Sequence, residues 1–295
     1  MQRLESALAV AAEAVNRTLD KLVPPVTGAE RRVVEAMRYA LMGGGKRIRP
    51  FLVLNGARLF DVPEEGARRT AAAIEMVHSY SLVHDDLPAM DNADLRRGRP
   101  SVHRQFDEAT AILAGDGLLT QAFEVLADPA THADPLVRAE LALALARAAG
   151  AAGMVGGQMI DLEAQHATLD LEAITRLQRM KTGAIIGFSC IAGAILASAP
   201  KAAHQALELY AEDLGLAFQI ADDLLDVESS EAVTGKPVGQ DQAAGKATFV
   251  AVLGVDEARR RATFIADRAA SHLDLFGNRA DLLRDMAHFV VNRRS

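Results

Sequence analysis

The stretch His78–Arg99, which reads HSYSLVHDDLPAMDNADLRRGR, is the part of the chain around which we expect the remainder to fold. Apolar, helix-like sequence leads into a group of acids, and a basic pair follows: Asp85, Asp86, Asp91, Arg96 and Arg97. Carboxylates this close repel one another unless a cation lies between them. Oxygen ligands suit Mg²⁺ better than Zn²⁺, and Mg²⁺ with arginine is a common means of holding phosphate. The stretch predicts a metal–phosphate site, with a solvated acidic helix end as the alternative.

A second acidic cluster, FQIADDLLD at Phe218–Asp226, strengthens the first interpretation. Asp222 and Asp226 are four residues apart, so on a helix they share a face, with Gln219 on roughly the same side and Asp223 beside them. Acids within an apolar helix are costly unless they are paired or bind a metal. Two such clusters on two helices would clamp one metal–phosphate group from both sides.

Composition favours one large helical unit of 295 residues. Hydrophobic residues make up 50% and aromatic residues 4%, and there is no Trp. Without an internal linker rich in Pro, Gly or Ser, we expect a single domain over residues 1–295. A net charge of −7 with a pI near 5.6 argues against a general nucleic-acid binder and suits a cytoplasmic protein. Cys190 is the only cysteine, so no intrachain disulfide is expected.

One stretch is long enough to consider as a membrane span. Thr182–Ala199 carries no charge, but it is mostly Gly, Ala, Ser and Thr, which favours a tightly packed core helix. Residues 1–23 contain acids among the apolar positions and indicate an amphipathic helix rather than an export signal. We therefore expect no stable membrane insertion.

Helical periodicity is expected through most of the chain, and no convincing strand alternation is seen. A capping box of Thr27 and Glu30 predicts a helix start near Gly28. The expected helices are Arg3–Leu22, Gly28–Leu41, Phe51–Phe60, Pro63 to the aspartates, Ser101–Leu126, Pro135–Ala149, Gly153–Glu163, Leu171–Ala199, Lys201–Val227, Asp256–Leu275 and Asn278–Arg293.

Further polar groups can be placed relative to these helices. The loop GGGKRIRP, Gly43–Pro50, lacks the Walker spacing, but its glycines let backbone approach a ligand and its basic residues suit an anion. An exposed basic turn is the alternative. His78 precedes Asp85 by seven residues, about two helical turns, so both point the same way. Pro88 should loosen this helix and swing Asp91 back toward Asp85.

Taken in order, GGGKRIRP, the His78–Arg99 stretch, KTG, and FQIADDLLD followed by GKP make the chain resemble the isoprenyl diphosphate synthases, more narrowly the bacterial farnesyl diphosphate synthases. The resemblance covers nearly the whole chain. It implies an all-α bundle around a deep central cavity, usually as a homodimer. It also implies head-to-tail condensation of dimethylallyl and geranyl diphosphate with isopentenyl diphosphate, giving farnesyl diphosphate and pyrophosphate.

The same resemblance assigns roles to residues of this chain. Three Mg²⁺ ions, with Mn²⁺ as an alternative, would be held on the allylic diphosphate chiefly by Asp85, Asp91 and Asp222, within the set Asp85, Asp86, Asp91, Asp222, Asp223 and Asp226. Three basic residues would contact that diphosphate: Arg96, Lys181 and Lys236. Four residues match the isopentenyl diphosphate site: Lys46, Arg49, His78 and Arg97. Oxygens of Thr182 and Gln219 would face the allylic cation.

Product length is expected to depend on the helix that carries Asp85. Tyr80 and Ser81 precede Asp85 by five and four residues, roughly 6–7.5 Å along a helix. By resemblance, Tyr80 is the aromatic floor of a fifteen-carbon product, and ordinary core packing of Tyr80 is the alternative. A geranylgeranyl diphosphate synthase is the second functional candidate.

Three other classes of protein fit the sequence less well. A terpene cyclase would not need a second diphosphate site and usually has a more aromatic cavity. A non-catalytic subunit of a heteromeric prenyl synthase typically loses aspartates that are intact here. A Mg²⁺-binding structural bundle would leave the clustered Lys and Arg unexplained. The basic tail Arg293–Arg294 is expected either to close over the second diphosphate or to fray.

Overall fold

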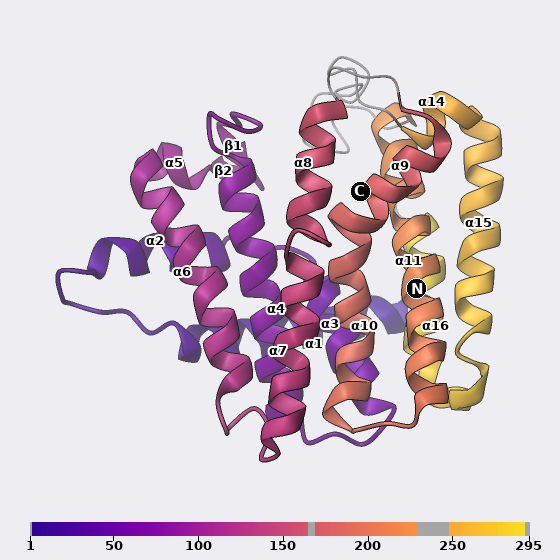
Figure 1. Ribbon diagram of the computed structural model, residues 1–295, viewed down its shortest axis with the longest axis horizontal. Helices are drawn as coiled ribbons and strands as arrows, with labels where there is room; N and C mark the ends of the chain where they lie inside the picture. The colour runs from indigo at the N-terminus through magenta and orange to yellow at the C-terminus, as the bar shows by residue number, and fades with distance from the viewer. Residues whose placement is uncertain (1, 165–168, 229–247, 293–295) are drawn as a thin grey trace.

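Nearly parallel long helices make up the structure, a computed structural model that describes residues 2–164, 169–228 and 248–292 (Figure 1). Helices account for 78% of the residues, which confirms the prediction of an all-α protein. In chain order, the described helices and strands are α1 (Gln2–Leu22), α2 (Arg31–Leu41), α3 (Ile48–Arg58), α4 (Glu64–Asp85), β1 (Leu95–Arg96), β2 (Arg99–Pro100), α5 (Val102–Gln105), α6 (Glu108–Ala127), α7 (Pro135–Ala149), α8 (Met154–Ala164), α9 (Leu171–Gln178), the π-helical turn η1 (Arg179–Gly183), α10 (Ala184–Leu196), α11 (Lys201–Glu228), α14 (Phe249–Leu253), α15 (Val255–Ser271), the 3₁₀ segment η2 (Asp274–Ala280) and α16 (Asp281–Asn292).

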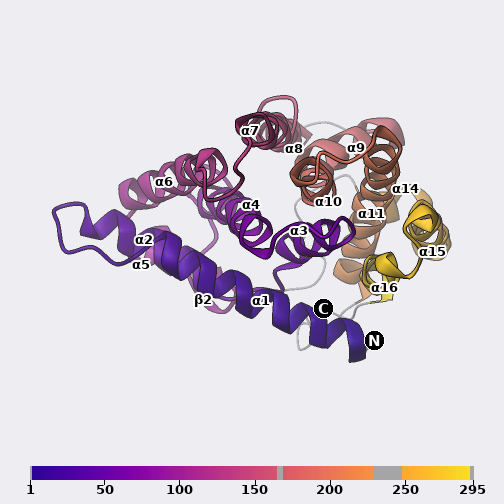
Figure 2. The ribbon, with the colours of Figure 1, turned by 90° about the horizontal axis from the view of Figure 1, so that it is seen from below.

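Two helices, α3 and α10, form the centre of the bundle. Every residue from Pro50 to Ala57 in α3 is buried, as are most of those in α10. Seen along the helix axes, α4 lies beside α3, and α7 and α11 lie beside α10 (Figure 2). Gly193 of α10 packs directly on Gly56 of α3, where an added Cβ would lie 2.3 Å from the Gly56 carbonyl carbon. This close helix contact explains why the Gly- and Ala-rich sequence of α10 belongs in the core.

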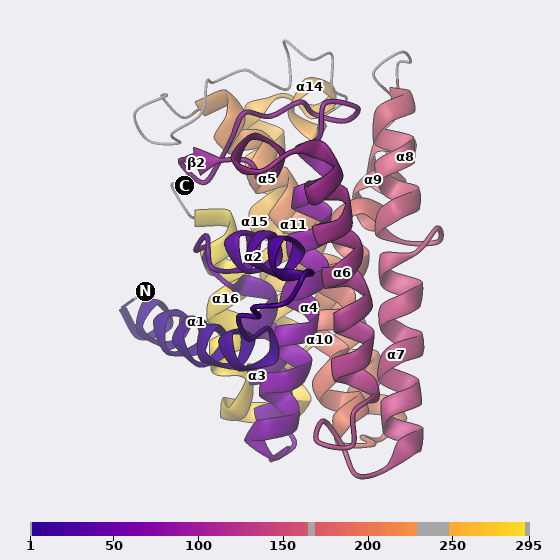
Figure 3. The same ribbon diagram turned by 90° about the vertical axis from the view of Figure 1, so that its left-hand side faces the viewer.

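The first helix does not run with the others. Figure 3 shows α1 lying across the outside of the bundle, and it packs on α3, α4 and α16. Its buried positions recur at helical spacing on one face: Leu4, Leu8, Ala11, Val15 and Leu19.

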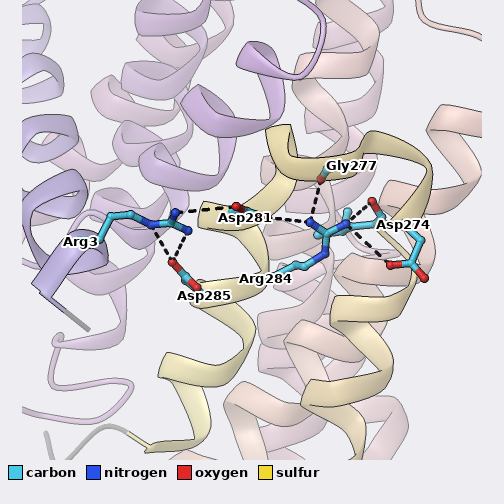
Figure 4. Close-up of polar contacts among 7 residues, drawn as sticks. Arg3, Asp274, Gly277, Asp281, Arg284 and Asp285 are labelled. Carbon is cyan, nitrogen blue, oxygen red and sulfur yellow. Dashed lines mark hydrogen bonds and ion pairs between the residues drawn. The ribbon is translucent and has the colours of Figure 1, made fainter.

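Ion pairs at the surface join the two ends of the chain (Figure 4). The Nη2 of Arg3 in α1 lies 2.7 Å from Oδ2 of Asp285, and its Nη1 lies 3.7 Å from Asp281, both in α16. On the same segment, Arg284 Nη1 donates to the Gly277 carbonyl at 2.8 Å. Exposed pairs of this kind contribute little to stability, so apolar packing holds α1 in place.

Several expected boundaries were wrong, and local chemistry explains each difference. No side-chain capping bond forms at the start of α2, which begins at Arg31 rather than near Gly28. The segment expected as one helix over Ser101–Leu126 is broken before Asp107, whose carboxylate caps α6 by accepting from Thr110 N at 2.7 Å. The segment expected as Leu171–Ala199 is interrupted by η1.

A short hairpin was also missed, since only two residues pair on each side. β1 and β2 pair in antiparallel fashion, with Leu95 opposite Pro100. The turn residues Arg97 and Gly98 both have positive φ, at 55° and 74°. Positive φ at both central positions is typical of the two-residue turns that match strand twist. The hairpin, rather than an open loop, therefore presents the two arginines that follow the acids.

Two described stretches pass a length and hydropathy test for membrane spans: Pro135–Ala164 and Leu171–Leu196. Within the second, 56% of the tested window is buried, and α10 lies at the bundle centre, which agrees with the expected core helix. In the first, only 33% of the tested window is buried, so the apolar residues of α7 and α8 are partly on the surface.

Candidate active site

The first acidic cluster lies where α4 ends. The helix stops at Asp85, and a tight turn brings the chain back, so that Asp91 N donates to the Asp85 carbonyl oxygen at 2.8 Å. Asn92 N also donates to the Leu87 carbonyl oxygen at 3.0 Å, and Pro88 lies within this turn. The predicted return of Asp91 toward Asp85 is therefore present, as a helix end rather than a loosened helix.

The middle acid of this cluster has a different environment. Asp86 is only 2% exposed, and its carboxylate accepts from Arg96 Nε at 3.0 Å and pairs with Arg96 Nη2. The Asp86 carbonyl accepts from Ala93 N at 3.1 Å. Burial opposes the charge on Arg96, but Asp86 and then Asp91 raise the pKa of its guanidinium. Asp86 thus fixes the hairpin arginine, whereas Asp85 and Asp91 carry the outer carboxylates.

Asp85 faces charges from two parts of the chain. Burial raises the pKa of its carboxyl to about 6, Lys181 lowers it in opposition, and Asp91 raises it further. Lys181 belongs to η1 and is almost a hundred residues from Asp85 in sequence. Its effect on Asp85 shows that the π-helical turn lies near the end of α4. A buried carboxylate with like charges beside it is poised to gain from a divalent cation.

The second acidic cluster lies near the end of α11, which Figure 1 shows finishing at the same end of the molecule as α4. Asp222 and Asp226 are half-buried one turn apart on a continuous helix, as predicted. Asp223 is 3% exposed, and its Oδ2 accepts from Phe249 N at 2.7 Å. Asp223 therefore anchors the start of α14.

A polar chain joins this cluster to η1. Thr182 Oγ1 donates to Gln219 Oε1 at 3.4 Å, and Gln219 Nε2 donates to Asp223 Oδ1 at 3.3 Å. Because the amide nitrogen of Gln219 donates its hydrogen bond to Asp223, the amide oxygen of Gln219 points toward Thr182. The two predicted oxygen donors are thus adjacent and held in a fixed orientation.

Two residues of α8 contribute to this side of the site and were missed. Asp161 Oδ2 lies 2.5 Å from Lys181 Nζ, and the two side chains are 18% and 26% exposed. Gly157, one turn earlier, packs on the backbone of η1, where a Cβ would lie 2.2 Å from Lys181 N. An acid on a mostly apolar helix, the signal used for Asp222, would have indicated Asp161.

A second group of predicted residues lines one cavity of about 550 Å³ at the glycine loop. Arg97 comes from the hairpin and His78 from α4, while Lys46 and Arg49 belong to the loop and the start of α3. The other lining residues are Gly43, Gly45, Arg47, Ile48, Glu75 and Phe218. Gly44 and Gly45 have φ of 84° and 126°, and Arg97 Nη1 donates to the Gly44 carbonyl. The glycine loop, for which an exposed basic turn was the alternative, therefore lines a cavity.

The cavity is strongly basic, and this affects the protonation state of His78. Burial, followed by the charges of Arg49 and Arg97, lowers the pKa of His78 well below its usual value. The ring is therefore neutral near pH 7, and its Nε2 lies 3.4 Å from Arg49 Nη1. A cavity lined by cations suits an anionic group such as a diphosphate.

Tyr80 and Ser81 lie below the acids on α4, as expected. Tyr80 is 6% exposed, and its ring meets that of His84 edge to face at 5.7 Å between centroids. The His84 Nε2 lies 3.0 Å from the Ile112 carbonyl of α6, over Gly115. Ser81 Oγ donates to the His78 carbonyl in its own helix at 3.0 Å. Tyr80 is thus packed against the His84 ring of its own helix, and that ring is held by the Ile112 carbonyl of α6.

The carboxylate oxygens of the two acidic clusters are donors that suit Mg²⁺. In residues 2–164, 169–228 and 248–292, no three acidic, histidine or cysteine side chains converge tightly enough to hold a metal alone. Mg²⁺ is usually bound by one or two carboxylates together with substrate phosphates and water. Carboxylates from two separated helix ends, with the pKa of Asp85 raised mainly by burial, fit a metal completed by phosphate oxygens. Lys236 and Arg293–Arg294 lie outside the described residues.

Comparison with known proteins defines the class. The family model described as polyprenyl synthetase matches residues 30–274, and the chain belongs to this family. The farnesyl diphosphate synthase of Geobacillus stearothermophilus is 44% identical, over 88% of each chain. A crystal structure described as an FPP/GFPP synthase from Zymomonas mobilis has a TM-score of 0.90 and 48% identity, covering 98% of this chain and 99% of that one.

These matches confirm the isoprenoid-synthase type of helical bundle and the prediction of a prenyltransferase with farnesyl diphosphate synthase function. The family generally uses Mg²⁺ and binds isoprenyl diphosphates. The geranylgeranyl diphosphate synthase of Cyanophora paradoxa is also similar, at 39% identity over 96% of this chain and 94% of that one. Product length therefore has to be argued from the chain's own residues.

Proposed function

We propose that this chain joins an allylic diphosphate to isopentenyl diphosphate at two adjacent sites. The allylic diphosphate binds between the acid ends of α4 and α11, against Lys181 and Arg96. Isopentenyl diphosphate binds in the cavity beside the glycine loop. The observation that carries this proposal is that two sites of different kinds, one acidic and suited to a metal-bound diphosphate and one basic, both border α4 and the β1–β2 hairpin.

Each site uses residue types suited to its part of the reaction. We assign Asp85, Asp91 and Asp222 as direct ligands of three Mg²⁺, with Mn²⁺ as a substitute, and Asp226 as a supporting carboxylate. The metal ions would neutralise the charge that grows on the departing diphosphate. Asp86 and Asp223 act mainly by positioning, since Asp86 holds Arg96 and Asp223 holds Gln219. By resemblance to the family, Lys236, which lies outside the described residues, is assigned to the same diphosphate.

The chain's own groups then guide the condensation. Lys181 and Arg96 hold the allylic diphosphate as its C–O bond breaks, and the bond's electron pair leaves with the diphosphate. Oxygens of Thr182 and Gln219 face the resulting allylic cation. The double bond of isopentenyl diphosphate attacks this cation, and the released diphosphate accepts the proton lost from the adduct. Buried aliphatic helices exclude the water that would quench the cation.

The fifteen-carbon product follows from Tyr80. Its ring is buried below Asp85 and braced by His84, so a chain growing down α4 meets an aromatic group supported from α6. Ser81, beside it, offers no bulk. Geranylgeranyl diphosphate is the alternative product, as for the relative from Cyanophora paradoxa.

A homodimer is the assembly we propose, with the exposed apolar face of α6, α7 and α8 as its interface. Large apolar side chains on this face are 45–76% exposed: Ile112, Leu113, Leu136, Leu143, Val155 and Met159. Such exposure on adjoining helices is typical of an interaction surface. Leu113→Glu should yield monomers in light scattering, whereas a wild-type chain that is already monomeric would contradict the proposal. We also propose one catalytic domain and a cytoplasmic location.

Substrate-specific kinetics test the two-site assignment. Lys46→Ala should raise the KM for isopentenyl diphosphate and leave the KM for geranyl diphosphate nearly unchanged. Lys181→Ala should do the opposite and lower kcat, because its amine lies on the allylic side beside Asp85. Equal effects of both variants on both KM values would refute two separate sites.

A further inference from the structure

Arg47 differs from the basic residues on either side of it in the glycine loop. Its side chain is 1% exposed and points into the protein rather than into solvent. Its Nη1 pairs with Glu75 of α4, its Nε donates to Asn16 Oδ1 of α1 at 3.0 Å, and its Nη2 donates to the Leu41 carbonyl. One guanidinium thus joins three helices, and it does so from the middle of a site-forming loop.

The backbone at this position is held in an unusual conformation. Arg47 has φ of 50° and ψ of 40°, the left-handed region that residues other than glycine seldom adopt. It also precedes the first residue of α3, so its conformation sets how the loop enters that helix. Strained backbone of this kind persists only where surrounding contacts impose it, and the buried guanidinium supplies those contacts.

Glu75 completes this arrangement from α4, three residues before His78. Its side chain is 2% exposed, and among the described residues that line the 550 Å³ cavity it is the one carboxylate. A carboxylate beside a diphosphate site would by itself oppose binding. Glu75 instead neutralises Arg47. Burial lowers the pKa of the nearby Arg97 guanidinium, and the charge of Glu75 opposes that lowering.

A buried ion pair is a strong positional constraint, because removing one partner leaves the other charged and unpaired. The planar guanidinium fork also fixes direction, which a lysine at this position would not do. Lys46 precedes Arg47 directly and Arg49 follows two residues later, so both depend on where Arg47 is held.

We propose that the Arg47–Glu75 pair is a positioning unit for the second diphosphate: it sets the loop so that Lys46, Arg49 and His78 converge on one anion. The inference rests on the proposed function, in which this cavity takes isopentenyl diphosphate. Neither Arg47 nor Glu75 needs to touch the substrate. Losing the pair should therefore weaken isopentenyl diphosphate binding more than allylic binding.

Steady-state kinetics of Glu75→Gln test this role, with the thermal midpoint measured beside them. We expect the KM for isopentenyl diphosphate to rise about tenfold or more, since a misplacement near 1 Å can cost ~10²-fold. The KM for geranyl diphosphate should change less than about twofold, because Arg96 and Lys181 are fixed by their own acids, Asp86 and Asp161, rather than by this pair.

Asp213→Asn is the matched control. Asp213 is also a buried acid paired with an arginine, at 2.6 Å from Arg268 Nη2, but it joins α11 to α15 away from the cavity. It should lower the thermal midpoint and leave both KM values unchanged. A Glu75→Gln variant that behaves like Asp213→Asn would overturn the positioning role.

Two further variants keep the test decisive. Arg47→Gln with Glu75→Gln removes both charges, so it should regain stability without regaining the isopentenyl diphosphate KM; full recovery of that KM would overturn the proposal. If Glu75→Gln does not fold, Glu75→Asp gives the same comparison of KM values. Lys46→Ala distinguishes failure of the positioning role from failure of the cavity assignment. If Lys46→Ala also leaves the KM for isopentenyl diphosphate unchanged, the assignment of the cavity to this substrate fails, and not only the role of Arg47–Glu75.

Discussion

Replacing Gly157 with alanine should damage catalysis without weakening the helix that carries it. A Cβ at Gly157 would lie 2.2 Å from the nitrogen and 2.6 Å from the Cα of Lys181. Ordinary contact begins at 3.4 Å, and both partners are backbone, so α8 and η1 must separate. The separation is about 1 Å, and a misplacement of that size can reduce the rate ~10²-fold.

Helix propensity by itself would make α8 more stable in Gly157→Ala, so it opposes the expected loss of activity. Alanine is favoured over glycine inside a helix by ~1 kcal/mol. A loss of activity in Gly157→Ala therefore cannot arise from a weaker α8. Gly187→Ala in α10 is the control, because a Cβ there meets no atom within 4 Å.

The assay is the steady-state rate with geranyl and isopentenyl diphosphates, measured beside the thermal midpoint of each variant. We expect kcat of Gly157→Ala to fall roughly 100-fold, since Lys181 and Thr182 move with η1. Gly187→Ala should keep wild-type kcat. A Gly157→Ala variant with full activity would refute the view that close packing of α8 on η1 positions the allylic site.

Three other changes give distinct outcomes. Tyr80→Ala should shift the product from fifteen to twenty carbons and cost about 3–5 kcal/mol of stability, as removal of a large buried aromatic does; an active variant making only farnesyl diphosphate would locate the floor elsewhere. Asp161→Asn should lower activity about 10–100-fold through Lys181, as outer partners of site residues do, measured with saturating isopentenyl diphosphate. For His78, the lowered pKa means that the unfolded chain takes up a proton below about pH 6.5 and the folded chain does not. The free energy of unfolding, measured by urea titration at several pH values, should therefore decrease as the pH is lowered below 6.5. It should decrease less in His78→Asn. Equal pH dependence of both proteins would contradict this reading of the cavity.

Hydrophobic periodicity and acid spacing were enough to predict most of the helical framework. The α7 prediction matched to the residue, and α1 and α11 matched within one residue at either end. Asp222 and Asp226 share a face because helix geometry requires it at a spacing of four. Elements set by short-range periodicity are the ones that a single sequence predicts well.

Features that depend on tertiary contact were beyond the sequence. Arg47 reads like its basic neighbours in GGGKRIRP, and only folding brings it to Glu75. The π-helical turn at η1 extends an apparently regular helix, and its position against Gly157 is decided by α8. The Arg97–Gly98 turn could have been read as a hairpin signal, but two-residue strands leave no alternation to detect.

Product analysis can establish whether this chain condenses the two diphosphates and stops at fifteen carbons. The purified chain would be incubated with Mg²⁺, isopentenyl diphosphate and either dimethylallyl or geranyl diphosphate, and the dephosphorylated products identified by mass spectrometry. We expect farnesol as the main product from both starters, with none when Mg²⁺ is chelated. Absence of condensation across metals and starters would contradict the proposed two-site chemistry, and geranylgeraniol as the main product would contradict the role given to Tyr80.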